Sequence, residues 1–348
     1  MLAIIGNSPS SGSTLLADLL DSTYHSACGV ELYCFANKNI YDFSYYRNHI
    51  KRSSITPSLC ALRNTTNFHR LHSYGLNTTE FIHMVRNSKD LREFADKFAS
   101  DFLALRGKDK NGVVFEKSPG NISFIDQFIK HFPDSYFIHI VRNPIFVYTS
   151  LLRRKFPNYI ALLTWFVDVA SYLKHKDKKN IIVVNYEVLV KKPFSIVNDI
   201  LQKVLHVNVS EEDIEKGYRE NSYRKIHSKK KMPWSVCKTG EVENANKKEI
   251  PREALAQISR LFNVKISKDY AKKFHLPEIS FVDALNEFNY YDDIMTRLET
   301  SGLKKNPKLP QKTFEDYLRL GAKWAFDFAH REASLAEMRL YLNPIERV

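Results

Sequence analysis

The chain has 348 residues, of which 44% are hydrophobic and 26% are charged, a composition that excludes a disordered chain and supports a large domain with a buried core. Its 52 lysines and arginines outnumber 39 acidic residues, and the formal net charge of +13 favours an anionic partner. Because basic and acidic residues are mixed along the chain, we expect a positive pocket for a phosphorylated small molecule rather than a nucleic-acid surface.

The N-terminal segment predicts a strand, a glycine-containing loop and a helix. Residues 2–5 are apolar, residues 6–14 read GNSPSSGST, and the leucines that follow recur at helical spacing. Gly6 and Gly12 lie one residue too far apart for the Walker motif GxxxxGK[ST], and Ser13 takes the place of its lysine. The loop therefore argues against an NTPase and predicts an anion site made of backbone N–H groups, hydroxyls and a helix N-terminus.

Three further short apolar runs predict strands, over residues 113–115, 136–141 and 181–184. Helical patterns precede each run, so strands and helices alternate. We expect an α/β fold, with a parallel sheet flanked by helices on both faces and ligands bound at the carboxyl ends of the strands.

Two regions depart from this alternation. Residues 35–87 are rich in aromatic residues, histidine and asparagine, and we expect an irregular lid or acceptor wall there. After residue 266, two helices are expected near 281–298 and 313–340. The chain is therefore divided into a domain over residues 1–265, with 35–87 as an insertion, and a helical C-terminal appendage over 266–348.

The chain carries no sequence signal for secretion, a membrane span or a zinc site. Its four cysteines are irregularly spaced, which predicts neither a disulfide scaffold nor a zinc site and favours a reducing compartment. No apolar run approaches the roughly 20 residues of a membrane span, and the first residues lack the features of a signal peptide. We expect a cytoplasmic protein.

Four signatures, in chain order, resemble those of the sulfotransferases that use 3′-phosphoadenosine 5′-phosphosulfate (PAPS). PSSGSTLL over residues 9–16 is similar to the family's 5′-phosphosulfate loop, and FEKSP over 115–119 to its strand-end lysine segment. FIHIVRNP over 137–144 is similar to its 3′-phosphate site, and NYEVL over 185–189 to its adenine-side tyrosine segment. The segment CGVE over 28–31 is similar to the tyrosylprotein sulfotransferase-like branch.

The resemblance implies a role for particular residues. Glu31 would be the general base, and Lys117 would neutralise charge on the leaving phosphate. If Glu31 is not the base, His69 and His72 are the next candidates. The remaining residues would bind the donor: Ser10, Ser11, Gly12, Ser13, Thr14, Arg142, Ser150, Arg154, Tyr186 and Lys248.

Two of these assignments concern how the phosphate groups of the donor would be bound. Ser150 lies about two helical turns after Arg142 and Arg154 one turn further on the same face, so the three could bind one phosphate. Ser10 stands where the family normally carries lysine or arginine. Either another cation replaces that residue or the donor is held differently.

The sequence therefore predicts a PAPS-dependent sulfotransferase that needs no metal and acts on a hydroxyl or amine. The acceptor would be a small molecule, a carbohydrate or a peptide and not a nucleic acid, and the C-terminal helices could form a homo-oligomer. Two alternatives stay open at this point. A nucleotide-dependent phosphotransferase is disfavoured by the missing Walker lysine, and a non-catalytic PAPS-binding protein is kept open by Ser10.

Overall fold

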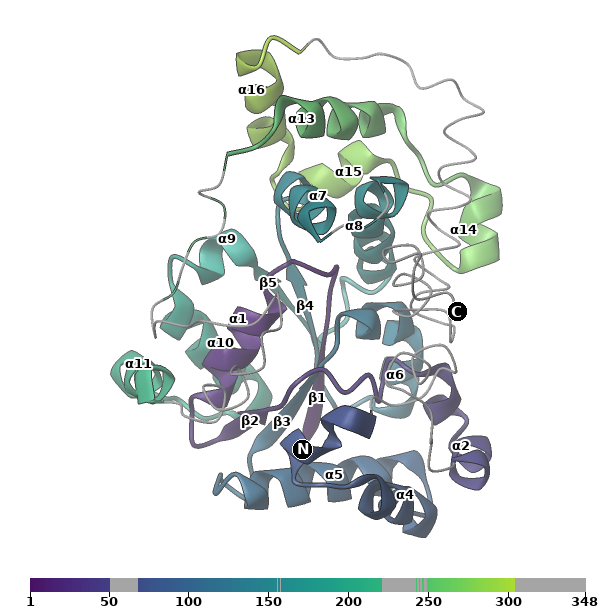
Figure 1. Cartoon of the computed structure of the whole chain (residues 1–348), viewed down its shortest axis with the longest axis vertical. Helices are drawn as coiled ribbons and strands as arrows, with labels where there is room; N and C mark the ends of the chain where they lie inside the picture. Colours follow the sequence, from purple (N-terminus) through teal and green to yellow (C-terminus); the bar gives the residue numbers. More distant parts are fainter. Residues whose placement is uncertain are drawn as a thin grey trace, which may run out of the picture.

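The chain folds around one five-stranded sheet in a computed structural model (Figure 1), which describes residues 1–50, 68–154, 156, 158–220, 242, 244, 246 and 249–303. The strand order is β2-β3-β1-β4-β5, and every pairing is parallel. The strands are β1 Leu2–Gly6, β2 Ser26–Cys28, β3 Val113–Lys117, β4 Phe137–Val141 and β5 Ile181–Asn185. The predicted α/β fold with a parallel sheet is confirmed.

The central strand β1 shows why the strands read as apolar runs. Ala3 and Ile5 pack into the hydrophobic cluster on one face of the sheet, and Leu2 and Ile4 into the cluster on the other. Successive side chains of a strand point to opposite faces, so a strand covered on both faces has no polar side. All five residues of β1 are buried.

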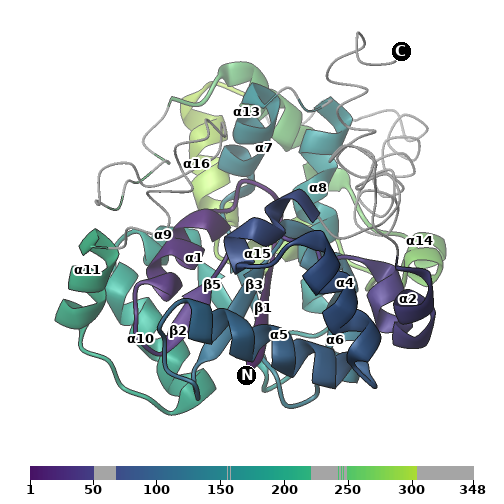
Figure 2. The same cartoon turned by 60° about the horizontal axis from the view of Figure 1, so that its bottom comes forward.

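Helices cover both faces of the sheet, as the two views show (Figures 1 and 2). The smaller cluster is closed by α1 Ser13–Asp21, α9 Tyr186–Leu189, α10 Pro193–Leu205 and α11 Glu211–Glu220. The larger cluster is closed by α2 Phe43–His49, α4 Thr78–Asn87, α5 Leu91–Leu105, α6 Ile125–His131, α7 Pro144–Arg153, α8 Asn158–Leu173, α13 Arg252–Ser259, α14 Lys268–Phe274, α15 Phe281–Glu287 and α16 Tyr291–Thr300. Short 3₁₀ helices are η1 Lys38–Tyr41, η2 Phe68–Tyr74, η3 Pro119–Phe124 and η5 Arg260–Asn263.

The segment over residues 35–87 is more regular than its composition suggested. Its described parts form η1, α2, η2 and α4, and most of their described aromatic side chains are core residues, although Tyr45 is 48% exposed. Phe81, for example, is fully buried with its ring edge-on to that of Phe94. An irregular segment was expected because its aromatic residues do not follow a clear helical period, but packing against α5 stabilises short helices there.

The described part of the predicted appendage packs on the same core as the sheet. The Phe281 ring lies 5.7 Å from the Trp165 ring and 5.6 Å from the Phe166 ring, centroid to centroid, and Ile294 is fully buried. The helix expected over 281–298 is interrupted at Asn289, whose φ of 58° separates α15 from α16. The helix expected over 313–340 lies outside the described residues, and the domain boundary at 265 stays a prediction.

The longest helix in the described residues is α8, which has 16 residues. A membrane-spanning helix needs about 20 apolar residues. None of the helices in the described ranges is both long and apolar enough to cross a membrane.

Candidate active site

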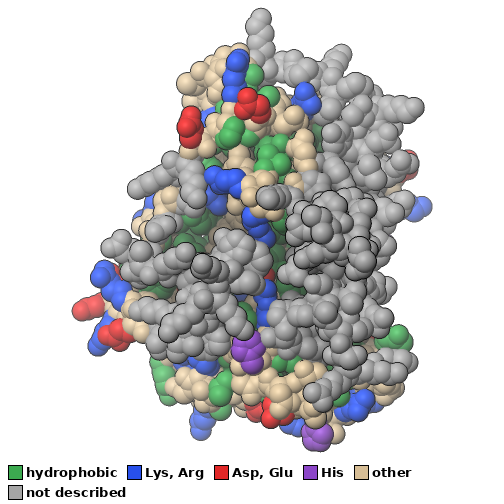
Figure 3. Space-filling model, viewed as in Figure 1, with side chains coloured by type: hydrophobic (Ala, Val, Ile, Leu, Met, Phe, Trp, Pro, Cys, Tyr) green, Lys and Arg blue, Asp and Glu red, His purple; other side chains and the backbone are tan. Residues whose placement is uncertain are grey.

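The candidate site lies at the carboxyl ends of β1 and β4, where the chain changes direction across the sheet. After β1 the chain continues to β2 and β3 on one side, and β4 and β5 lie on the other. Such a switch point leaves a crevice in which ligands of parallel sheets bind. Lys and Arg side chains gather along the middle of the face seen in Figure 3. The predicted loop and Arg142 both lie at this crevice, since Nη1 of Arg142 donates to the carbonyl oxygen of Ser10 at 3.0 Å.

The loop after β1 has an unusual backbone. Ser10 and Gly12 both have positive φ, 73° and 95° respectively. A Cβ atom on Gly12 would lie 2.3 Å from the Tyr186 ring, so glycine is required both by the conformation and by the ring. Tyr186 itself is buried. The predicted loop and the predicted adenine-side tyrosine are therefore in direct contact.

The loop presents unused hydrogen-bonding groups. Helix α1 begins at Ser13, and no side chain caps its N-terminus. The first N–H groups of a helix have no partner within the helix, and they carry its positive dipole end. Ser11 is buried, and its Oγ has no hydrogen-bond partner among the described residues. Ser13 is buried and Thr14 half-buried in the first turn. These groups fit the oxygens of a phosphosulfate.

Arg142 is held by neutral groups. Its Nε donates to Oδ1 of Asn246 at 2.8 Å, and its guanidinium lies 4.6 Å from the centroid of the Tyr186 ring. Asn246 donates in turn to Glu187, 2.8 Å away, and the hydroxyl of Tyr290 also donates to Glu187, at 2.7 Å. Burial lowers the pKa of Arg142, although Tyr186 and Glu187 oppose this effect. Arginine nevertheless stays protonated at neutral pH, so Arg142 places a buried positive charge in the crevice.

Arg154 contacts the loop from the C-terminal end of α7. Arg154 follows the last turn of α7, and its Nη1 donates to Oγ of Ser10 at 2.9 Å. Ser150 is half-buried one turn earlier and accepts the backbone N–H of Arg154 through its carbonyl. Arg142 and Arg154 thus meet at the same loop residue. Lys248 lies outside the described residues, two positions after Asn246.

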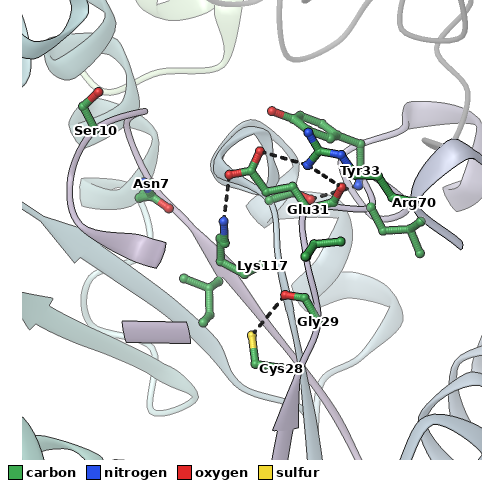
Figure 4. Close-up of polar contacts among 12 residues, drawn as sticks. Asn7, Ser10, Cys28, Gly29, Glu31, Tyr33, Arg70 and Lys117 are labelled. Carbon is green, nitrogen blue, oxygen red and sulfur yellow. Dashed lines mark hydrogen bonds and ion pairs between the residues drawn. The ribbon is translucent and has the colours of Figure 1, made fainter. Parts of the chain in front are cut away.

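Glu31 and Lys117 form an ion pair on the other side of the crevice (Figure 4). Lys117 ends β3, and its Nζ donates to Oε1 of Glu31 at 2.7 Å. Arg70 lies 3.5 Å from Oε2 of Glu31 and donates to its backbone oxygen at 3.0 Å. Burial raises the pKa of Glu31, but the charges of Lys117, Arg70 and Arg154 outweigh it and hold this pKa below its usual value. Glu31 is therefore ionised at neutral pH.

Two residues that the sequence did not indicate fix the segment before Glu31. The Tyr74 hydroxyl donates to the carbonyl oxygen of Val30 at 2.6 Å, and its ring occupies the space that a side chain at Gly29 would need. Tyr74 and Arg70 both belong to η2, so this 3₁₀ helix positions the carboxylate. His72 on the same helix is exposed, and the side chain of His69 lies outside what the structure describes.

Tyr33 adds a neutral phenol next to the carboxylate. Burial, reinforced by the charge of Glu31, raises the pKa of Tyr33 well above its ordinary value. Its backbone N–H donates to Oγ of Ser118 at 2.9 Å, which ties it to the residue after Lys117. Within the described ranges, no group of three or more histidine, cysteine or acidic side chains is arranged to hold a metal ion.

Comparison with protein families agrees with this arrangement. A model described as "Sulfotransferase family" matches residues 3–207, which is more than half of the chain. The chain belongs to the sulfotransferase family. The matched residues include the loop after β1, Glu31, Lys117, Arg142 and Tyr186. A search of curated proteins found no match.

Solved structures of sulfotransferases are similar to this chain at low identity. The sulfotransferase domain from the Synechococcus PCC 7002 olefin synthase is 19% identical, with a TM-score of 0.47, and 84% of this chain and 94% of that one are covered. The sulfotransferase domain from the curacin biosynthetic pathway is 16% identical, with a TM-score of 0.48, and 83% and 97% are covered. A sulfotransferase from Alicyclobacillus acidocaldarius is 13% identical, with a TM-score of 0.39, and 79% and 95% are covered.

Proposed function

We propose that the chain transfers the sulfuryl group of PAPS to a hydroxyl or amine acceptor and releases 3′,5′-phosphoadenosine (PAP). Membership of the sulfotransferase family supports the transfer, and the site supports a phosphorylated nucleotide as donor. In the transfer, the bond from sulfur to the bridging oxygen breaks and a bond from sulfur to the acceptor atom forms. The electron pair stays on the bridging oxygen, and the acceptor's proton goes to a base.

The observation that carries the proposal is the contact between Arg142 and the loop at Ser10. It places a buried cation 3.0 Å from a loop whose next residues, Ser11 and Gly12, offer a hydroxyl without a partner and a close backbone approach. A charged donor bound bidentately to phosphate gives both affinity and orientation. Arg142 and Ser150 would bind the 3′-phosphate, Ser11 to Thr14 the 5′-phosphosulfate, and Tyr186 would lie beside the adenine. Lys248 stays a predicted donor ligand.

Glu31 and Lys117 would carry the chemical step. The pKa of Glu31 is held low, whereas a phenol titrates near 10, so complete proton transfer before attack is strongly uphill. Glu31 therefore takes the proton as the bond to sulfur forms and the acceptor oxygen becomes acidic. Lys117, 2.7 Å from Glu31, would stabilise charge on the leaving oxygen.

The alternative functions have less support from the site. A phosphotransferase of the Walker type would use a lysine at Ser13, and this position is a hydroxyl. A non-catalytic binding protein has no need of a buried carboxylate next to a lysine. Glu31 and Lys117 side chains are only 13% and 4% exposed, and such a pair is expensive to bury.

The test is a binding and transfer experiment on the whole chain. Calorimetry should give nanomolar to micromolar affinity for PAP and much weaker affinity for ATP. PAPS with a labelled sulfuryl group should then be incubated with a tyrosine peptide, tyramine, an amino sugar and a phenol, followed by a search for labelled products. ATP that competes as well as PAPS would contradict the donor. PAP binding without transfer to any acceptor or to water would favour the non-catalytic alternative.

The acceptor class, the partners and the location in the cell stay predictions. The tyrosylprotein branch suggested by residues 28–31 would make the acceptor a peptide phenol, and Tyr33 and Arg70 beside Glu31 would then contact it. We retain a small molecule, a carbohydrate or a peptide as acceptor, a cytoplasmic location and a homo-oligomer as predictions. A product screen and light scattering address the acceptor and the oligomer.

A further inference from the structure

Arg154 is a further candidate for the chemical step of the function proposed above, on which its role rests. Two guanidinium groups reach the same loop residue from opposite ends of α7. Nη1 of Arg142 donates to the backbone oxygen of Ser10 at 3.0 Å, and Nη1 of Arg154 donates to its hydroxyl at 2.9 Å. Ser10 has a φ of 73°, so its backbone is turned into a conformation that few side chains adopt. These two contacts hold it there.

The two arginines face different halves of the crevice. Arg142 lies over the Tyr186 ring and contacts Asn246, on the side of β5. The charge of Arg154 acts instead on Glu31 and Tyr33, on the side of β3. The side chain of Arg154 is therefore located between the loop and the acid–base pair, not beside Arg142 at the nucleoside end.

The charges around Glu31 are unequal. Lys117, Arg70 and Arg154 all act on this one carboxylate, and burial raises the pKa of Glu116, the other carboxyl that interacts with Lys117, which favours its neutral form. The hydroxyl of Ser10 adds no charge to the loop. Buried charges of one sign without equal compensation are costly, and a bound anion would offset that cost. The excess positive charge lies between the loop that would hold the 5′-phosphosulfate and the base that would take the acceptor's proton.

We propose that Arg154 is a catalytic residue: it supplies, from the end of α7, the positive charge that the loop lacks at Ser10, and it stabilises the oxygen that leaves sulfur. When the sulfur–oxygen bond breaks, its electron pair stays on that oxygen and the 5′-phosphate gains a negative charge. A preorganised guanidinium at this position lowers the energy of the developing charge. The sequence alone predicts a different role for Arg154, as a ligand of the 3′-phosphate with Arg142 and Ser150.

The first experiment separates these two roles by binding alone. Calorimetry measures the affinities of PAP and of AMP, which lacks the 3′-phosphate, and the ratio reports the 3′-phosphate contact. Arg142→Ala should reduce this ratio about 30-fold, because a charge-assisted contact is lost. Arg154→Ala should leave the ratio within about twofold of the wild-type value. A ratio that falls in Arg154→Ala as far as in Arg142→Ala would overturn the inference.

The second experiment measures the chemical step. Under single turnover with saturating PAPS, Arg154→Ala and Arg154→Gln should each lower the rate of loss of the sulfuryl group about 10²-fold, to an acceptor from the screen or to water. Gln keeps a donor for Ser10 but carries no charge, and Arg154→Lys should therefore retain most of the rate. Arg153→Ala is the control, since Arg153 is the exposed neighbour. A normal rate in Arg154→Gln would overturn the inference.

The third experiment is a rescue. Ser10→Lys in the Arg154→Ala background puts a cation back on the loop and should recover the rate at least tenfold. No recovery, in a protein that still binds PAP, would mean that Arg154 acts through the position of Ser10 and not through its charge. Failure of the proposed function is distinguishable, because the wild-type chain would then neither bind PAP nor release the sulfuryl group.

Discussion

The two sides of the crevice treat charge differently. On the side of β3, which we call the acid–base half, Glu31 is in direct contact with Lys117 and near Arg70. On the side of β5, the donor half, Arg142 donates to an amide oxygen and a carbonyl oxygen and stacks on Tyr186. In the first half a carboxylate is in direct contact with a cation, whereas the groups in direct contact with Arg142 in the second half are neutral. Neutral groups in direct contact with Arg142 leave part of its field for a ligand, although the charge of Glu187 also acts on it, and this difference supports the proposal that the donor half binds the anion.

The largest effect is expected from Glu31→Gln. The amide keeps the side-chain shape and removes the base, so single-turnover rates should fall roughly 10²–10⁴-fold while PAP affinity changes little. Glu212→Gln, on the exposed surface of α11, is the matched control. In acid the wild-type rate should fall as well, at a pH below the ordinary titration range of a glutamate, because the charges of Lys117, Arg70 and Arg154 hold the pKa of Glu31 down. A near-normal rate in Glu31→Gln would move the base elsewhere, with His69 and His72 as the first candidates.

Lys117→Ala tests whether the compensated pair is used in the chemistry. It removes the cation 2.7 Å from Glu31 and should lower the single-turnover rate by about 10²-fold, comparable to the loss of one preorganised donor. Lys110→Ala, at an exposed position before the same strand, serves as control. If the rate is unchanged but the protein is less stable, Lys117 has a structural role only.

Arg142→Ala tests the donor half. The variant should lose about 2 kcal/mol or more of PAP binding free energy, because a charged phosphate loses its charge-assisted donor. Arg92→Ala, at an exposed position on α5, should bind PAP normally. Calorimetry measures the PAP affinity of each variant. Equal affinity in Arg142→Ala and wild type would contradict the proposed 3′-phosphate site.

The buried Asp168 on α8 makes the free energy of unfolding depend on pH. Burial raises its pKa to about 7, opposed by a hydrogen bond with Ser8 at the start of the loop. Between pH 4 and pH 7 the folded protein therefore keeps a proton that the unfolded chain loses, so this group makes the free energy of unfolding fall as pH rises. Asp168→Asn should remove this loss, on the order of 1–2 kcal/mol between pH 5 and pH 7. Denaturant titrations at both pH values, with exposed Asp177→Asn as control, test the sign.

The smallest effect is expected from Tyr290→Phe. Its hydroxyl donates to Glu187 at 2.7 Å and accepts from Asn185 at 2.9 Å, and the loss of these bonds should cost about 0.5–1.5 kcal/mol of stability. Because Glu187 also holds Asn246 against Arg142, PAP affinity should fall by a few-fold. Tyr24→Phe, on a side chain that is 62% exposed, should change neither quantity. Unchanged PAP affinity in Tyr290→Phe would show that this network does not orient Arg142.

The sequence was sufficient for the parts of the site that follow directly from strands. The loop after β1, Lys117 at the end of β3 and Arg142 after β4 are each adjacent to an apolar run, and parallel strands bring their carboxyl ends together. Arg70 and Tyr290 could not be found in this way. They reach Glu31 and Glu187 across 39 and 103 residues, through the packing of η2 and α16, and neither carries a local signature. Tertiary packing, not local pattern, places them.

The hydrogen bonds around Arg142 indicate how much of the chain a functional protein needs. The family match stops at residue 207. The side chain that accepts the hydrogen bond from Nε of Arg142 is Asn246, which lies beyond that residue. Asn246 donates to Glu187, and Glu187 also accepts a hydrogen bond from Tyr290. A shortened protein cut at the border of the matched region would keep Glu31, Lys117, Arg142 and Arg154 but lose the groups that orient Arg142, together with the predicted donor ligand Lys248. In a gene fusion or an expression fragment, the smallest autonomous unit should therefore extend beyond Tyr290, into α16.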